Sequence, residues 1–279
     1  MEWNMLFGQP LFALLLPALI AVGIFYQRSY KFGRQSLDIG EESAIGSKES
    51  QEDAAGASQT TWGTLTVLAQ GMGKGQAGKI AALVTVRTFM DLFVSHDVIS
   101  NIHYFFNQAF SQSNREVLER LQGAKGGTAV AAVAIHKGQL YYASVGDVKI
   151  AVFRKQELIS INDGHTMKSA AIKGFSQGVL SKEQALAISK QDRQSNYLGR
   201  DGFKNIEMGI EPIYLTAGDI IIVMNQGIYK CLSWVELESI LTQTASSQRL
   251  AEQIIGAFNA KNVPEKDNAN LFVLRYNGV

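Results

Sequence analysis

A long apolar segment near the N-terminus constrains the fold of this chain more than any other feature. No charged residue interrupts the sequence from Met5 to Tyr26, and a membrane-spanning helix needs about 20 predominantly apolar residues. Pro10 and Pro17 would be costly inside a soluble helix, but helices in membranes tolerate proline. The sequence therefore predicts one N-terminal transmembrane helix within residues 1–26.

The charges on either side of this segment predict its orientation. Glu2 precedes the segment, whereas Arg28, Lys31 and Arg34 follow it. By the positive-inside rule, the part that follows faces the cytoplasm. A cleaved signal peptide is the alternative, but the segment lacks the basic start and the small-residue cleavage site of such a peptide. We therefore expect a single-pass protein of the cell membrane whose soluble domain faces the cytoplasm.

The sequence then becomes polar. Residues 27–47 are rich in Ser, Gly and Glu and have no sustained apolar period, which is typical of a linker. Residues 48–279 alternate apolar runs with glycine-containing turns, and a segment of this length can bury a substantial core. We predict three parts: an anchor over 1–26, a polar linker over 27–47 and one soluble domain over 48–279.

The composition excludes several classes of function. The formal net charge is +1 and no long basic run is present, so nothing indicates a nucleic-acid partner. Cys231 is the single cysteine, which excludes a disulfide framework. The four histidines show no zinc-ligand spacing; they are His96, His103, His136 and His165.

Apolar patterning predicts both helices and strands in the soluble domain. Ala82, Val86, Phe89 and Phe93 recur at helical spacing. Further helices are predicted over 100–122, 181–190, 234–242 and 248–260. Strands are predicted over 64–69, 128–135, 139–145, 149–154, 157–162, 211–216, 219–225 and 271–276. Because helices and strands occur in groups, we expect an α/β chain with a layered α+β architecture, in which packed antiparallel sheets are flanked by helices.

Short polar or glycine-containing turns adjoin several of these runs. In chain order they are Gln51-Glu52-Asp53, Gln70-Gly71-Met72-Gly73, Gly146-Asp147, Asn225-Gln226-Gly227 and Asp267-Asn268. With their flanking strands, these turns resemble the motifs of the PPM-type (type 2C) metal-dependent Ser/Thr protein phosphatases, from Lys48 to Tyr276. For example, VLAQGMGKGQAG is similar to V-A-D-G-M-G-G-h-x-x-G of that family. The resemblance implies an α-β-β-α sandwich of two antiparallel sheets between helices.

The resemblance also implies a metal site. Enzymes of this family hold two Mg²⁺ or Mn²⁺ ions between carboxylates, and a metal-bound water attacks the phosphorus. The motifs place Glu52, Asp53, Asp267 and the carbonyl group of Gly71 at metal-ligand positions. Asp147 matches the position that the family associates with a third metal ion.

Four positions depart from the family pattern. Gln70 replaces the bridging aspartate, and Gln226 and Lys230 replace two further aspartates. Lys48 replaces the arginine that grips phosphate, and a lysine cannot make the planar bidentate contact. The lost negative charge no longer offsets the repulsion between two nearby divalent ions. We therefore assign no catalytic residue, expect no cofactor and expect a domain that is stable without metal; Mn or Mg would bind only at a residual site.

Three functions remain in competition. The first is a membrane-anchored pseudophosphatase that acts in signal transduction by binding a phosphoprotein, a kinase or a membrane complex. The second is an active or atypical Mn/Mg-dependent Ser/Thr protein phosphatase with a reduced metal site. The third is a nucleotide sensor, because Gly73-x-Gly75-x-x-Gly78 matches the dinucleotide fingerprint and, with Lys79, nearly matches a P-loop. Ile80 stands where a P-loop needs Ser or Thr, which argues against the third.

Overall fold

The computed structural model describes residues 36–191 and 193–278. The transmembrane helix predicted for residues 1–26 lies outside these ranges, as do residues 27–35 of the predicted linker. Within the ranges, no helix has the length and apolarity needed to cross a bilayer. The elements below all belong to the structural unit Leu37–Val279.

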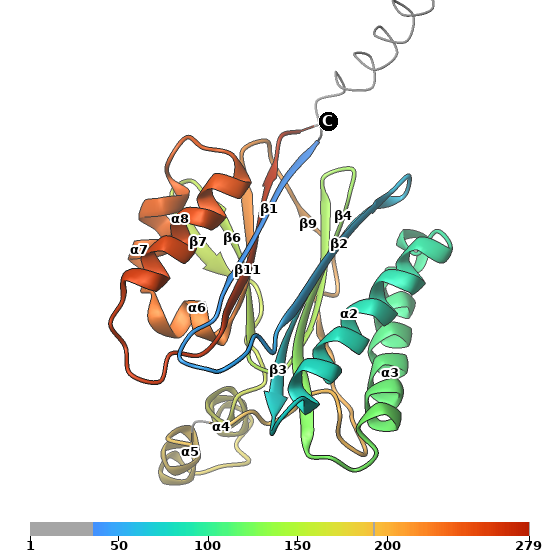
Figure 1. The fold of residues 1–279 in the computed structure, drawn as a ribbon, viewed down its shortest axis with the longest axis vertical. Coiled ribbons are helices and arrows are strands. Elements are labelled where there is room, and N and C mark those ends of the chain that lie inside the picture. Colours follow the sequence, from blue (N-terminus) through green and yellow to red (C-terminus); the bar gives the residue numbers. More distant parts are fainter. Residues whose placement is uncertain (1–35, 192, 279) are drawn as a thin grey trace, which may run out of the picture. The chain divides into compact units, whose positions relative to one another are not determined.

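Two antiparallel sheets pack face to face at the centre of this unit (Figure 1). The first sheet has the order β1-β11-β10-β6-β7, with strands Leu37–Ala44, Ala269–Tyr276, Ile220–Asn225, Val148–Arg154 and Glu157–Ser160. The second has the order β2-β3-β4-β5-β8, with strands Ala54–Thr60, Gly63–Gly73, Gly126–His136, Gln139–Val145 and Glu207–Met208. The short strand β9 (Ile213–Tyr214) pairs with β5. The predicted pair of antiparallel sheets with helices is thereby confirmed.

Side chains that alternate along each strand build the core on both faces of the sheets. On β10, Ile221 and Val223 pack between the two sheets with Phe272 of β11. Their neighbours Ile220 and Ile222 point to the opposite face and pack with the helices outside it. Because β10 is covered on both faces, its sequence is an uninterrupted apolar run.

Helix pairs cover the outer face of each sheet (Figure 1). On the second sheet lie α2 (Ala77–Ser95) and α3 (Ile102–Leu121), which the short 3-10 turn Ile99–Asn101 precedes. The predicted face of α2 is confirmed, since Phe89 and Phe93 are buried and pack edge-on against Phe105 of α3. On the first sheet lie α7 (Trp234–Leu241) and α8 (Ser247–Ala260), with the short α6 (Gln226–Cys231) at the end of β10.

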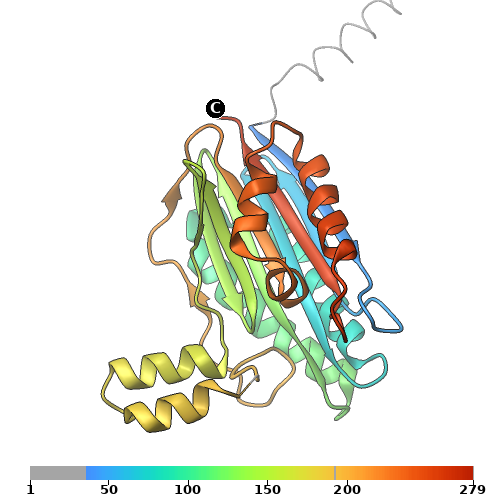
Figure 2. The ribbon, with the colours of Figure 1, turned by 90° about the vertical axis from the view of Figure 1, so that its left-hand side faces the viewer.

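A helical hairpin stands apart from these layers (Figure 2). It consists of α4 (Met167–Ser176) and α5 (Lys182–Ser189). Each helix begins with a capping box, formed by Thr166 with Ser169 and by Ser181 with Gln184. Ala171 is the only buried residue of the two helices, so the sandwich core does not fix the hairpin.

The prediction of a linker up to residue 47 is wrong for its second half. Residues 37–44 form β1, which pairs with β11 from Leu37–Tyr276 to Ala44–Ala269. The strand lies at the edge of its sheet, and only Leu37 and Gly40 are buried, so it needs few apolar residues. Gly40 lies against α8, where a Cβ atom would come within 2.3 Å of the Ser247 carbonyl carbon. The domain therefore includes residues that precede Lys48.

Candidate functional site

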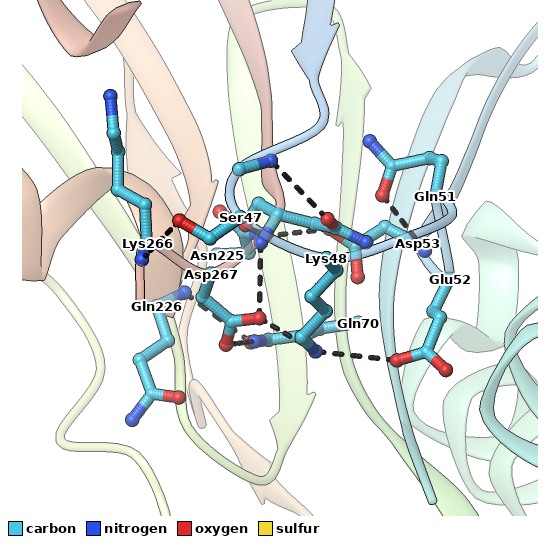
Figure 3. Close-up of polar contacts among 12 residues, drawn as sticks. Ser47, Lys48, Gln51, Glu52, Asp53, Gln70, Asn225, Gln226, Lys266 and Asp267 are labelled. Carbon is cyan, nitrogen blue, oxygen red and sulfur yellow. Dashed lines mark hydrogen bonds and ion pairs between the residues drawn. The ribbon is translucent and has the colours of Figure 1, made fainter. Parts of the chain in front are cut away.

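The positions that the motifs single out meet at one end of the two sheets (Figure 3). Gln70 lies near the end of β3, Gln226 follows β10 directly, and Asp267 precedes β11. The loop 48–53 connects β1 to β2, and Asp147 occupies the turn between β5 and β6. Antiparallel pairing thus brings together residues that are far apart in the sequence.

Lys48 lies between two carboxylates of this cluster (Figure 3). Its Nζ is 2.7 Å from Oδ1 of Asp267 and 3.2 Å from Oε2 of Glu52. Burial lowers the pKa of Lys48, but hydrogen bonds to Asp267 and Glu52 and their charges outweigh burial and raise the pKa overall. The ammonium group is therefore charged at neutral pH and supplies positive charge between the two carboxylates.

Gln70 connects the two sheets through its amide group. Its Nε2 donates a hydrogen bond to Oδ2 of Asp267 over 3.1 Å, and its Oε1 accepts one from the backbone N–H of Gln226 over 3.3 Å. Gln70 is buried. A carboxylate here would repel Asp267 and could not donate when ionised. The glutamine therefore makes contacts that an aspartate at this position would not make in the absence of a cation.

Asn225, which belongs to a motif turn but to none of the predicted ligand positions, is completely buried at the centre of the cluster. Its Nδ2 donates to Oδ2 of Asp53 and to the carbonyl oxygen of Asn268, both over 2.7 Å. Its Oδ1 accepts from the backbone N–H groups of Asn270 and Ile228, the latter as the N-cap of α6. This side chain thus joins β10, α6 and the loop before β11.

Asp53 is a buried carboxyl group. Burial and the charge of Asp267 raise the pKa of Asp53 to about 8, although Lys48 and hydrogen bonds from Gly71 and Asn225 oppose the increase. At neutral pH the protonated form therefore predominates. The backbone of Gly71 lies against this loop, and a Cβ atom there would come within 2.3 Å of the carbonyl oxygen of Glu52, so the position requires glycine.

Both carboxylate oxygens of Asp147 already accept hydrogen bonds. The hydroxyl group of Tyr229 donates to Oδ1, and Nε2 of Gln226 donates to Oδ2 over 3.1 Å. The preceding Gly146 donates its N–H to Nδ1 of His165 over 3.2 Å and accepts the N–H of His165 over 2.8 Å. Burial lowers the pKa of His165, so the ring is neutral at pH 7 and can accept this bond. His165 is therefore a structural residue that fixes the turn of Asp147.

An open pocket of about 680 Å³ adjoins the cluster. Its charged lining residues come from the cluster and from its surroundings: Lys48, Asp147 and Asp267, together with Arg193, Lys230, Glu265 and Lys266, and the amides of Gln194 and Gln226 also line it. Lys230 lies on α6, where the motif has an aspartate in the family. The pocket is therefore bordered by cations as well as by the retained carboxylates.

The side chains at these positions do not fit a pair of divalent metal ions. Gln70 and Gln226 bring no charge, and Lys48 brings a positive charge to the carboxylate Asp267. Such ions prefer several ionised oxygen ligands, and the oxygens of Asp147 are already hydrogen-bonded. Across the part of the chain that the structure describes, no group of three His, Cys, Asp or Glu side chains is arranged to hold a metal ion.

Two of the three glycines of the dinucleotide fingerprint, Gly73 and Gly78, serve the packing between β3, α2 and β4, and Gly75 has a positive φ angle of 62° with open space around it. A Cβ atom on Gly78 would lie 2.7 Å from the backbone nitrogen of Met72, and one on Gly73 would lie 2.9 Å from Cα of Gly126. The preceding strand β3 pairs antiparallel with both of its neighbours, whereas the fingerprint requires a parallel βαβ unit. The structure therefore does not support the nucleotide-sensor alternative.

Two facing antiparallel sheets, flanking helices and a polar cluster where the sheets end define the class of the PPM-type Ser/Thr phosphatases, and the chain is related to that family by sequence and by fold. Protein phosphatase PhpP of Streptococcus pneumoniae is 24% identical over 219 residues, which cover 77% of this chain and 86% of PhpP. The Ser/Thr phosphatase Stp of Listeria welshimeri is 22% identical over 220 residues, which cover 76% and 84%. No protein-family model matches the chain.

Solved structures show the same fold. The Ser/Thr phosphatase of Streptococcus agalactiae superimposes with a TM-score of 0.76 at 24% identity, over 86% of this chain and 99% of that one. The phosphatase PstP/Ppp of Mycobacterium tuberculosis gives a TM-score of 0.69 at 20% identity, over 86% and 98%. A PstP catalytic domain in complex with two manganese ions gives 0.66. These relatives are phosphatases, and on that ground they favour the phosphatase alternative over the pseudophosphatase hypothesis.

Proposed function

We propose that this chain is a PPM-fold binding protein, a pseudophosphatase, in which Lys48 and side-chain amides hold the end of the sandwich together in place of metal ions. One observation carries the proposal: the Nζ atom of Lys48 lies 2.7 Å from Asp267 and 3.2 Å from Glu52, two of the retained metal-ligand positions. An ammonium group bound there supplies the positive charge that carboxylates in a cluster require.

The amides complete this replacement. Gln70 donates to Asp267, Gln226 donates to Asp147, and Asn225 donates to Asp53. Each retained aspartate therefore accepts a hydrogen bond from a neutral neighbour. Buried polar groups are stable when they are satisfied in this way, so the cluster is closed by the chain's own side chains. The remaining function of the domain is then to bind a protein partner, such as a phosphoprotein or a kinase.

The second candidate is an active Mn/Mg-dependent Ser/Thr phosphatase with a reduced metal site. The observation in its favour is that its relatives, at 24% and 22% identity, are phosphatases. In this alternative the carboxylates of Glu52 and Asp267 hold an ion, which requires Lys48 to move away from them. Geometry therefore supports the first candidate, and similarity supports the second.

Activity and metal binding distinguish the two candidates. The full chain is purified in detergent and assayed with Mn²⁺ and either p-nitrophenyl phosphate or a phosphopeptide. We expect no turnover above background. Turnover that the substitution Asp267→Ala abolishes would contradict the proposal.

A restored site provides the positive control. The triple variant Gln70→Asp, Gln226→Asp and Lys230→Asp returns the family's aspartates at all three positions. We expect calorimetry to detect Mn²⁺ binding to the triple variant but not to the parent chain. Equal binding by both proteins would show that these residues are not at metal positions.

We further propose that the domain is held at the cytoplasmic face of the cell membrane by residues 1–26. The uncharged stretch from Met5 to Tyr26 and the basic residues after it support this location. Deleting residues 1–26 should move the protein from the membrane fraction to the soluble fraction of lysed cells. Retention of the truncated protein in a carbonate-washed membrane fraction would contradict the anchor.

A further inference from the structure

Several large apolar side chains are exposed on the α4–α5 hairpin. Ile172, Phe175, Val179 and Leu186 are 52% to 74% exposed, and they lie on one small projecting element (Figure 2). Single exposed apolar residues need no explanation, whereas contiguous groups of them are typical of interaction sites. The core of the sandwich does not use these side chains, so they are available to another molecule.

Lysines flank these apolar residues on both helices. Lys168, Ile172 and Phe175 lie on one side of α4, because they are spaced by four and three residues. Lys182 and Leu186 of α5 and its C-cap residue Lys190 also lie on one side, because each is four residues from the next. The hairpin therefore presents two stripes in which exposed lysines border exposed apolar side chains.

The hairpin carries a net positive charge. Residues 166–191 contain four lysines, including Lys173, and a single acidic residue, Glu183, which accepts a hydrogen bond from the hydroxyl group of Ser181. Among the described residues, none of the four lysines forms an ion pair with a carboxylate. The surface thus combines apolar contact area with unpaired positive charge, and its complement is an acidic amphipathic segment.

The base of the hairpin is joined to the candidate site. The N–H of Met167 donates to the carbonyl oxygen of Arg193 over 2.9 Å, and Thr166 forms a β-bridge with Gln194. Arg193 and Gln194 both line the pocket. His165, directly before the hairpin, fixes the turn of Asp147. A molecule that binds the hairpin therefore lies beside the pocket.

Unpaired lysines beside exposed apolar side chains, next to the pocket, suit an acidic amphipathic protein segment as the occupant of the hairpin. The chain enters the domain at Leu37, and β1 places this residue beside Tyr276. The hairpin lies at the opposite end of the sandwich, as Figure 1 shows. The surface of the hairpin is therefore separated from the Leu37 end of the domain by the length of the sandwich.

We propose that the α4–α5 hairpin is the docking surface for an acidic amphipathic segment of a protein partner. The apolar side chains of the segment cover Ile172, Phe175 and Leu186, and its carboxylates pair with Lys168, Lys182 and Lys190. This inference deepens the proposed binding function, because it assigns the surface and the chemistry of the partner, and it rests on that function.

Photocrosslinking of the full chain in its host cells tests the proposal. Benzoylphenylalanine is introduced at Phe175 or Leu186 and, as the control, at Leu83 of α2, which is 52% exposed. Crosslinked peptides are sequenced by mass spectrometry. We expect adducts from Phe175 and Leu186, but not from Leu83, with a protein segment that carries net negative charge and apolar residues.

Charge reversal provides the second measurement. The triple variant Lys168→Glu, Lys182→Glu and Lys190→Glu should lower the adduct yield at least tenfold. The matched control reverses three exposed lysines elsewhere, Lys137, Lys155 and Lys204, and should leave the yield unchanged. Circular dichroism melts of both variants show whether the fold is retained.

Four outcomes would overturn the proposal: phospholipid adducts in place of protein adducts, neutral or basic crosslinked segments, equal yields from Leu83, or no adducts at all. None of them depends on the metal positions. A chain that proves to be an active phosphatase could still dock a partner through the hairpin. An inactive chain without hairpin adducts would retain the proposed function and lose only this surface.

Discussion

The side chain of Gln70 donates a hydrogen bond to Asp267 over 3.1 Å, across 197 positions of the sequence. The first residue belongs to the second sheet and the other precedes a strand of the first sheet. This bond and the ion pair of Asp267 with Lys48 therefore close the end of the sandwich at which the two sheets meet.

Replacing Gln70 by Asp should destabilise the domain when no metal is present. The new carboxylate would be buried next to Asp267, and the donor to that residue would be lost. We expect a decrease of about 1–3 kcal/mol in the free energy of unfolding, measured with urea in the presence of EDTA. The control is Gln59→Asp on the exposed side of β2. An unchanged stability for Gln70→Asp would show that the amide is not needed there.

Replacing Lys48 by Met should make the stability of the domain depend on metal. The substitution leaves Glu52 and Asp267 without their shared cation. Because Lys48 is partly exposed, we expect a loss of about 1 kcal/mol, and we expect Mn²⁺ to restore part of it. Thermal unfolding with and without Mn²⁺ measures both effects. Lys137→Met, in an exposed turn, is the control and should show neither effect.

Removing divalent metal should not alter the native chain. In the described structure its charged cluster is already compensated by Lys48 and by amide donors. We therefore expect the same melting temperature with EDTA and with excess Mn²⁺. A decrease of many degrees in EDTA would indicate a structural metal ion and would support the phosphatase alternative.

Replacing Asp53 by Asn should stabilise the domain relative to the parent chain, and this difference in the free energy of unfolding should grow as the pH rises. Burial, aided by the charge of Asp267, raises the pKa of Asp53 from 3.8 to about 8. The folded state thus binds a proton more tightly than the unfolded state, and this contribution is complete below pH 3.8 and is lost as the pH rises towards 8. An uncharged Asn does not titrate. Urea unfolding at several pH values in this window should show a growing difference between variant and parent.

The control for this titration is the exposed Asp201→Asn. Its effect on the free energy of unfolding should not follow the same curve. If the difference for Asp53→Asn stays constant across the window, the buried carboxyl group is not protonated in the folded state.

The sequence predicts the fold best where buried side chains recur at a regular spacing. The face of α2 with Phe89 and the apolar run of β10 follow directly from the patterning of side chains. Strands β1 and β2 left no such pattern: β1 lies at the edge of its sheet, and both consist largely of small or polar residues. Tertiary pairing, which overrides local propensity at sheet edges, forms these strands.

The sequence was also informative about which residues gather in the site. The resemblance of the motifs to the PPM family implies that Gln70, Gln226 and Asp267 lie together. The sequence could not predict the pairing within the cluster. Asp267, which precedes β11 and pairs with Lys48, is distant from it in the sequence, and its position depends on the register of the sheet. The role of Asn225 was missed, although its position before Gln226 and its capping chemistry were a usable signal.

Strand β1 also gives the domain a mechanical property. A force on its Leu37 end, directed along the strand, loads the paired residues from Leu37–Tyr276 to Ala44–Ala269 in shear, so that they resist it together. The same ladder ends next to the loop of Lys48 and the residue Asp267. A slip of one residue would turn every side chain of β1 to the other face and would pull Lys48 out of register with its carboxylates. Strand β1 therefore transmits tension from the N-terminal end of the domain to the polar cluster.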